Sequence, residues 1–154
     1  SRKIARTIVH ERKTAPIEST LQLAEIIRNC YPPAKRFSKI HPATKSFQAL
    51  RIEVNNELGV FSDTLPQVAS KLVMNGRLAV ISFHSLEDRL AKIVFKELEQ
   101  RTELPLYKTS RKPIVPSPSE IFENSRSRSA KMRVLERISF KRDKNKYAHL
   151  NVKE

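Results

Sequence analysis

Polar side chains that could hold a nucleic acid recur at helical spacing in the segment HPATKSFQALRIEVNNEL, residues 41–58. Four of them are separated by three, three and four positions, so a helix would place them on one face: Lys45, Gln48, Arg51 and Asn55. A cation and an amide on one face can bind a phosphate and a base edge together. The same spacing is equally typical of a solvated helix face that binds nothing.

A second set of polar residues follows a short apolar run at residues 78–81. Such a run predicts a strand covered on both faces, as in parallel sheets, and ligands of open α/β sheets bind beyond the carboxyl ends of their strands. Ser82 and His84 lie at that end without a structural explanation, whereas Ser85 matches a helix cap. A hydrolase that uses Ser, His and Asp on a nucleophile elbow is not supported, because no G-x-S-x-G motif is present. No metal site is predicted, because the four histidines are dispersed.

Basic residues far outnumber acidic ones: 30 Lys and Arg against 16 Asp and Glu give a formal net charge of +14. Residues 126–146 hold nine of the cations and two acids, and residues 35–51 hold five cations and no acid. Such clusters suit contact with a phosphate backbone. We therefore favour a nucleic acid as the partner over a merely solvated basic surface. RNA is favoured over DNA because the sequence holds no zinc finger or basic zipper.

The counts of glycine and cysteine narrow the function further. With only Gly59 and Gly76, the chain has no glycine-rich loop for a phosphate or a nucleotide. Its one cysteine, Cys30, excludes a disulfide framework and fits a reducing cytoplasm, and its place in a helical stripe predicts that it packs. No apolar run approaches the ~18 residues of a membrane span, so no membrane partner is expected. A length of 154 residues predicts one domain or slightly more.

Hydrophobic periodicity predicts helices on both sides of the apolar strand. Helices are expected at about residues 2–15, 20–30, 43–58, 62–74, 85–99 and 119–123, and a late strand at 131–140. The helix at 43–58 would end at Gly59 and bury a stripe of Phe47, Leu50, Val54 and Leu58. Residue 2 already lies in a helical pattern, which predicts further chain upstream. The last dozen residues are expected to form a solvated tail.

Four segments, in this order, resemble the bacterial 16S rRNA cytosine-N4 methyltransferases of the MraW/RsmH type: HPATKSFQALRIEVNNEL, GRLAVISFHSLEDR, KPIVPSPSEI and RSRSAKMRVLERI. Near the start, RKIARTIVHER and APIESTLQLAEII resemble the helical insert of that family. The resemblance runs from residue 2 to about 138. It implies an α/β fold, namely the C-terminal half of a class I (Rossmann-like) methyltransferase with part of a helical insert. Residues 1–57 would be the later part of the substrate-recognition insert, and 58–154 the second half of the α/β domain with a basic tail.

The same resemblance implies a reaction. It is the S-adenosylmethionine-dependent methylation of the exocyclic amine of a decoding-centre cytidine in 16S rRNA, in the cytoplasm. The family's cofactor-binding residues would lie upstream, and this chain, with its two glycines, carries none of them. Neither a catalytic residue nor a metal ligand is assigned. The residues expected on the RNA side are His41, Lys45, Gln48, Arg51, Asn55, Ser82, His84, Ser85, Arg126, Arg128, Lys131 and Arg133.

Three interpretations stay open at this point. The chain is the C-terminal half of a methyltransferase, active in the intact protein and inactive as these residues alone. Alternatively, it is a non-enzymatic RNA- or ribosome-binding module derived from that half, or a basic α/β fragment without a function of its own. Half of an α/β sheet would leave an edge and helix faces uncovered. We therefore expect the chain to form a homodimer, to exchange elements with a second copy, or to fold only beside the other half.

Overall fold

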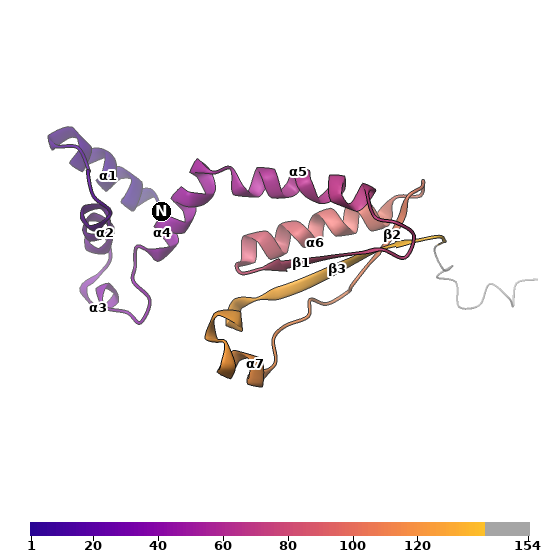
Figure 1. Cartoon of the computed structure of the whole chain (residues 1–154). Coiled ribbons are helices and arrows are strands. Elements are labelled where there is room, and N and C mark those ends of the chain that lie inside the picture. Colours follow the sequence, from indigo (N-terminus) through magenta and orange to yellow (C-terminus); the bar gives the residue numbers. More distant parts are fainter. Residues whose placement is uncertain (141–154) are drawn as a thin grey trace, which may run out of the picture. The chain divides into compact units, whose positions relative to one another are not determined.

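The computed structural model describes residues 1–140 and shows a mixed helix-and-strand chain, as the sequence predicts (Figure 1). It divides into two compact units, Ser1–Glu57 and a second unit that begins at Leu58. Among the described residues, none of the helices has the length and apolar character needed to cross a membrane. The expected C-terminal tail, with four of the predicted cluster's cations, lies outside the described residues.

The first unit consists of four helices: α1 (Arg2–Thr14), α2 (Thr20–Asn29), α3 (Pro33–Arg36) and α4 (Thr44–Val54). Helix α1 packs against α2, and Ile27 of α2 is fully buried. Ser19 caps α2, since its hydroxyl accepts a hydrogen bond from the backbone N–H of Gln22 at 3.1 Å. Cys30 is half-buried, and its thiol donates to the Ile26 carbonyl at 3.3 Å.

The prediction of one helix over residues 43–58, stopped by Gly59, is wrong. Helix α4 ends at Val54, and Asn56 adopts a left-handed φ of 48°, a conformation that Asn tolerates better than most residues. The next helix, α5 (Glu57–Ser70), begins two residues before Gly59 and runs through it. The prediction of a buried apolar stripe along this helix is also wrong, because Leu50 and Val54 are exposed.

The second unit holds α5 and a three-stranded sheet of β1 (Arg77–Ser82), β2 (Leu106–Thr109) and β3 (Lys131–Ile138). The strand order is β1-β3-β2, and both pairings are antiparallel, with Val80 of β1 opposite Arg133 of β3. The prediction of a parallel strand covered on both faces is therefore wrong for the described sheet. Along β1, Val80 and Ser82 are buried, whereas Ala79 and Ile81 on the other face are exposed.

One face of the sheet is covered by α6 (Ser85–Gln100), which contacts all three strands (Figure 1). Phe95 and Leu98 of this helix pack with Tyr107 of β2 and Leu135 of β3, and α5 adds Leu65 and Ala69 to the same core. The large side chains in this core that are at most 2 % exposed are Phe95, Leu98, Tyr107 and Leu135. Burial of side chains of this size stabilises a fold by about 1.5–3 kcal/mol each. This core packs α6 from Ala91 onward against the sheet.

The turn before β1 accounts for the second glycine. Asn75 adopts a left-handed φ of 62°, and its N–H donates to the Arg137 carbonyl at 3.0 Å. A Cβ atom on Gly76 would lie 2.8 Å from the backbone oxygen of Val73, so a larger residue would force the turn to shift. Gly76 thus serves a tight turn, and Gly59 lies inside a helix.

The C-terminal part of the described chain returns along the sheet. It contains α7 (Pro118–Glu123), the 3₁₀ helix η1 (Ser125–Ser129) and then β3. The short helix and the late strand are confirmed, whereas β2 was not predicted because its four residues carry too short a pattern.

Candidate nucleic-acid interface

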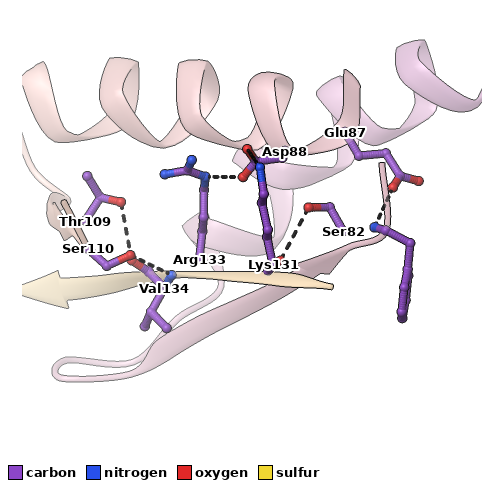
Figure 2. A network of polar contacts seen from close by, with 9 residues as sticks. Ser82, Glu87, Asp88, Thr109, Ser110, Lys131, Arg133 and Val134 are labelled. Atoms are coloured by element: carbon purple, nitrogen blue, oxygen red, sulfur yellow. Dashed lines mark hydrogen bonds and ion pairs between the residues drawn. The ribbon is translucent and has the colours of Figure 1, made fainter. Parts of the chain in front are cut away.

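His84 is the N-cap of α6, a role that the sequence analysis gave to Ser85. Its Nδ1 accepts a hydrogen bond from the backbone N–H of Glu87 at 3.3 Å. In return, a carboxylate oxygen of Glu87 accepts from the N–H of Phe83 at 3.1 Å (Figure 2). These reciprocal bonds satisfy two N–H groups at the start of the helix. The assignment of the cap to Ser85 is therefore wrong, and Ser85 is the exposed first residue of the helix.

The cap also fixes the orientation of the imidazole ring. Because Nδ1 accepts a hydrogen bond, the proton of the neutral ring lies on Nε2. That nitrogen is buried 3.2 Å from a carboxylate oxygen of Glu87 and makes no hydrogen bond within the described residues. The two hydrogen bonds between the start of the helix and residues 83–84 thus hold the strand end in place.

Substitution of His84 tests its structural role as the cap of α6. His84→Ala is expected to lower the free energy of unfolding by about 1 kcal/mol, because the cap is lost. His84→Asp is expected to retain most of the stability, since Asp is a strong N-cap. Chemical denaturation of the two variants measures the difference. Equal losses in both would contradict the capping role.

Asp88 joins three elements through a partly buried ion-pair network (Figure 2). One of its carboxylate oxygens accepts from Arg133 Nε at 2.8 Å, and the other lies 3.3 Å from Lys131 Nζ. Ser82 adds a hydroxyl that donates to the Lys131 carbonyl at 3.3 Å. The network thus ties the end of β1 and the first residues of β3 to the first turn of α6.

The network affects whether Arg133 and Lys131, two of the predicted RNA contacts, are accessible to RNA. The side chain of Arg133 is only 8 % exposed and faces the helix, so its guanidinium is engaged inside the fold. Lys131 is 43 % exposed and retains access to solvent. Composition and spacing alone could not show which cations of this cluster are buried. The one available signal is Asp88 itself, an acid in the first turn of a helix in a chain rich in cations.

The carboxyl group of Asp88 has a shifted pKa. Burial raises this pKa, but hydrogen bonds and charge from Arg133 and Lys131 outweigh the burial, so the pKa lies below its ordinary value. Asp88 is therefore ionised at neutral pH, which the paired cations require.

Arg126 and Arg128 extend from η1, just before β3. Both are exposed, and neither has an ion pair within the described residues. Between them Ser127 is buried, and its hydroxyl donates to the Asn124 carbonyl at 2.8 Å. Asn124 also caps η1 by accepting from the N–H of Arg126 at 3.2 Å. The alternating Arg-Ser pattern thus anchors the turn through serine and presents arginine to solvent.

The predicted polar face of α4 belongs to the first unit. Lys45 is exposed and Gln48 is half-buried, while Asn55 forms the C-cap beyond the helix. Arg51 makes a bidentate pair with Glu57, with distances of 2.8 Å and 3.1 Å. His41 uses Nδ1 to accept from the N–H of Ala43 at 3.2 Å. Among the described residues, Lys45, Gln48 and the side chain of Asn55 are therefore the free binding groups of this face.

The family model of the MraW methylases matches residues 1–138. This chain belongs to the MraW methylase family. It is 52 % identical over 136 residues to the ribosomal RNA small subunit methyltransferase H of Sulfurihydrogenibium sp. (strain YO3AOP1), covering 88 % of this chain and 46 % of that protein. The corresponding proteins of Persephonella marina and Lactiplantibacillus plantarum are 49 % and 47 % identical, each over 90 % of this chain. The chain spans slightly less than half the length of these relatives.

Membership of a methylase family implies S-adenosylmethionine, and the described residues do not fit it. The strand-to-helix connection from β1 to α6 contains no glycine, and its first turn carries the carboxylates of Glu87 and Asp88. Both glycines lie elsewhere, in a helix and in the turn before β1. Within residues 1–140, no group of three or more His, Cys, Asp or Glu could hold a metal ion. In this MraW-family chain, the described residues thus offer no glycine loop for the cofactor.

Proposed function

We propose that this chain is the RNA-binding part of an S-adenosylmethionine-dependent methyltransferase that modifies N4 of a cytidine in 16S rRNA. The observation that carries the proposal is the family match over residues 1–138, with relatives named for methylation of small-subunit ribosomal RNA. The cofactor-binding residues would belong to the part of those relatives that this chain does not match. Such an enzyme acts in the cytoplasm on the small ribosomal subunit or its RNA.

The described side chains would serve this reaction by binding and orienting RNA. Arg126 and Arg128 are free to contact phosphates, and Lys45 adds a third exposed cation. The amide of Gln48 and the hydroxyl of Ser85 can bind a base edge. Methylation of an exocyclic amine depends mainly on positioning, and the cytidine must be unstacked before its amine is accessible. Within the second unit, His84 and the Asp88 network would hold Ser85 and the start of β3 in place rather than react.

A second candidate is a non-enzymatic RNA-binding module. It is favoured by one observation, the absence of a fitting cofactor site among the described residues. Calorimetry of the full 154-residue chain with S-adenosylmethionine tests our assignment of the cofactor site to another segment, because tight binding would contradict it. Methyl transfer by a longer protein that includes this chain would distinguish the enzyme from the module.

RNA binding is expected to weaken steeply as salt is raised. Each phosphate contact contributes about −0.7 to −0.9 to the slope of log K against log salt concentration. Replacing both Arg126 and Arg128 by Gln should therefore make the slope shallower by about 1.5. Fluorescence anisotropy of a labelled small-subunit rRNA fragment, titrated at several salt concentrations, measures both values.

The matched control is the double variant Lys92→Gln with Lys96→Gln, which removes two exposed cations of α6 and should change the slope less. A flat salt response of the unmodified chain would refute phosphate contact.

A further inference from the structure

Phe37 is an aromatic side chain that the fold leaves almost entirely in solvent. It follows the short helix α3 in the first unit, and it is 83 % exposed. Isolated exposed apolar residues are common in soluble proteins, so exposure alone assigns no role. What distinguishes Phe37 is its surroundings.

A guanidinium group lies over the Phe37 ring. The central carbon of Arg28, from α2, is 5.6 Å from the ring centroid, within the range of a cation–π contact. Arg28 is itself held by an ion pair with Glu25, one turn earlier on the same helix. The high exposure of Phe37 shows that the contact with Arg28 leaves most of the ring surface accessible.

The segment that carries Phe37 is braced by hydrogen bonds. Arg36 donates from Nε to the Tyr31 carbonyl at 2.9 Å and from Nη2 to the Asn29 carbonyl at 3.3 Å. After the ring, the Ser38 hydroxyl donates to the Ile40 carbonyl at 2.6 Å. The backbone on both sides of Phe37 is thus tied locally, which lowers the entropy cost of presenting the ring to a ligand.

The charged residues next to Phe37 in the sequence are all cations, and the one carboxylate near the ring, that of Glu25, is paired with Arg28. No acidic residue occurs between Glu25 and Glu53, and exposed Lys35 and Lys39 flank Phe37 by two residues on either side. An exposed aromatic ring between free cations is the arrangement with which proteins bind single-stranded nucleic acid. The ring stacks on a base, and the cations contact the adjoining phosphates.

We propose that Phe37 is a stacking platform for an unpaired base of single-stranded RNA, with Lys35 and Lys39 at the neighbouring phosphates. The site lies outside the twelve residues assigned from the sequence. It rests on the proposed function, because it takes RNA as the ligand. Stacking on a phenyl ring accepts any base, so this site contributes affinity and positioning and leaves the choice of cytidine to other groups.

The chain contains no tryptophan, so Phe37→Trp introduces a single fluorescent reporter at the proposed site. Addition of a short oligocytidylate to the full chain is expected to quench its emission, because the base stacks on the indole. Inorganic polyphosphate, which offers charge without bases, is expected to leave the emission nearly unchanged. Leu21→Trp is the matched control, since Leu21 is 78 % exposed on α2 and has acidic residues nearby at positions 18 and 25. Its emission should not respond to the oligonucleotide.

Removal of the ring gives an independent measure. Phe37→Ala is expected to weaken RNA binding roughly 5- to 150-fold, the range of one base-stacking contact, while Phe37→Trp retains binding. Circular dichroism should show both variants folded, because the side chain is exposed.

RNA binding by Phe37→Ala at unchanged affinity would overturn the stacking site and leave the proposed function intact. Equal quenching by oligocytidylate and polyphosphate would overturn it too. If neither the unmodified chain nor any variant binds RNA, both the proposed function and the stacking site fail. Quenching confined to Phe37→Trp and to base-containing ligands, with weaker binding by Phe37→Ala, supports the site.

Discussion

Replacement of Asp88 by Asn is expected to lower the free energy of unfolding by about 3 kcal/mol at neutral pH. The substitution leaves the buried guanidinium of Arg133 without its 2.8 Å carboxylate partner, and it also removes the partner of Lys131. A buried charge without compensation is among the more costly defects in a folded protein. Urea or thermal denaturation of the full chain measures the loss. Asp63→Asn is the matched control, because Asp63 is an exposed residue of α5 and this change should have little effect.

The effect of Asp88→Asn should depend on pH in a defined direction. The pKa of Asp88 is lowered in the folded chain, so its stabilising contribution is fully present above the ordinary value of 3.8. That contribution is lost as pH falls through the lower folded pKa, where the carboxyl group takes up a proton. The difference in stability between the unmodified chain and Asp88→Asn should therefore be constant near neutral pH and shrink below about pH 4. A difference that stays the same in strong acid would contradict the ion-pair explanation.

A second substitution distinguishes the loss of the ion pair from a general packing defect. Arg133→Met in the Asp88→Asn background removes the stranded charge and restores an apolar stem of similar length. Exchange of a buried pair for apolar residues is often nearly neutral, so much of the lost stability should return. If the loss of stability in the double variant equals the sum of the losses in Asp88→Asn and Arg133→Met, the two residues act independently. That result would contradict the ion pair as the source of the stability.

The sequence predicted the elements of this chain better than their arrangement. Apolar periodicity and caps located α1, α2 and α6, and the apolar run located β1, because these signals are local. The direction of pairing is not a local signal. A continuous apolar run fits a parallel strand, and the antiparallel partner, β3, lies about 50 residues later along the chain. The break after Val54 was missed because two consecutive asparagines provided it rather than the glycine that follows.

For the candidate site too, the sequence located the segments but not the arrangement of their side chains. The sequence identified the segment 82–85 and the Arg-Ser turn, since both combine polar groups with apolar anchors. It could not assign roles inside them. The cap belongs to His84 because its ring nitrogen reaches the Glu87 N–H, and Arg133 is buried because β3 turns that position towards α6. Both facts depend on side-chain direction, which residue spacing in a basic segment does not specify. Whether all twelve predicted residues contact RNA stays a prediction.

The face of the sheet opposite α6 is expected to drive self-association of the chain. Ile81 and Phe83 are each 57 % exposed on this side, and Ile114 and Val115 are exposed in the segment that bridges to β3. Strand β1 also lies at an edge of the described sheet, where its outer backbone groups can pair with another strand. A second copy can bury the same patch on both partners, as symmetric dimers do. We therefore expect a concentration-dependent dimer in sedimentation or light-scattering experiments.

Charged residues on this face should abolish the dimer without unfolding the chain. In a symmetric interface Ile81→Lys and Phe83→Lys each act twice, and every buried side chain of this size contributes about 1.5–3 kcal/mol, so dimerisation should weaken at least about 100-fold. Val60→Lys is the matched control, because Val60 is 56 % exposed on α5 and not on the sheet. Loss of association in the control as well would place the interface elsewhere. An unmodified chain that stays monomeric at high concentration would show that the open face of the sheet does not bind a second copy. Dissociation confined to the sheet variants would show that the apolar face, rather than the basic surface, holds the copies together, so the cations stay free for RNA.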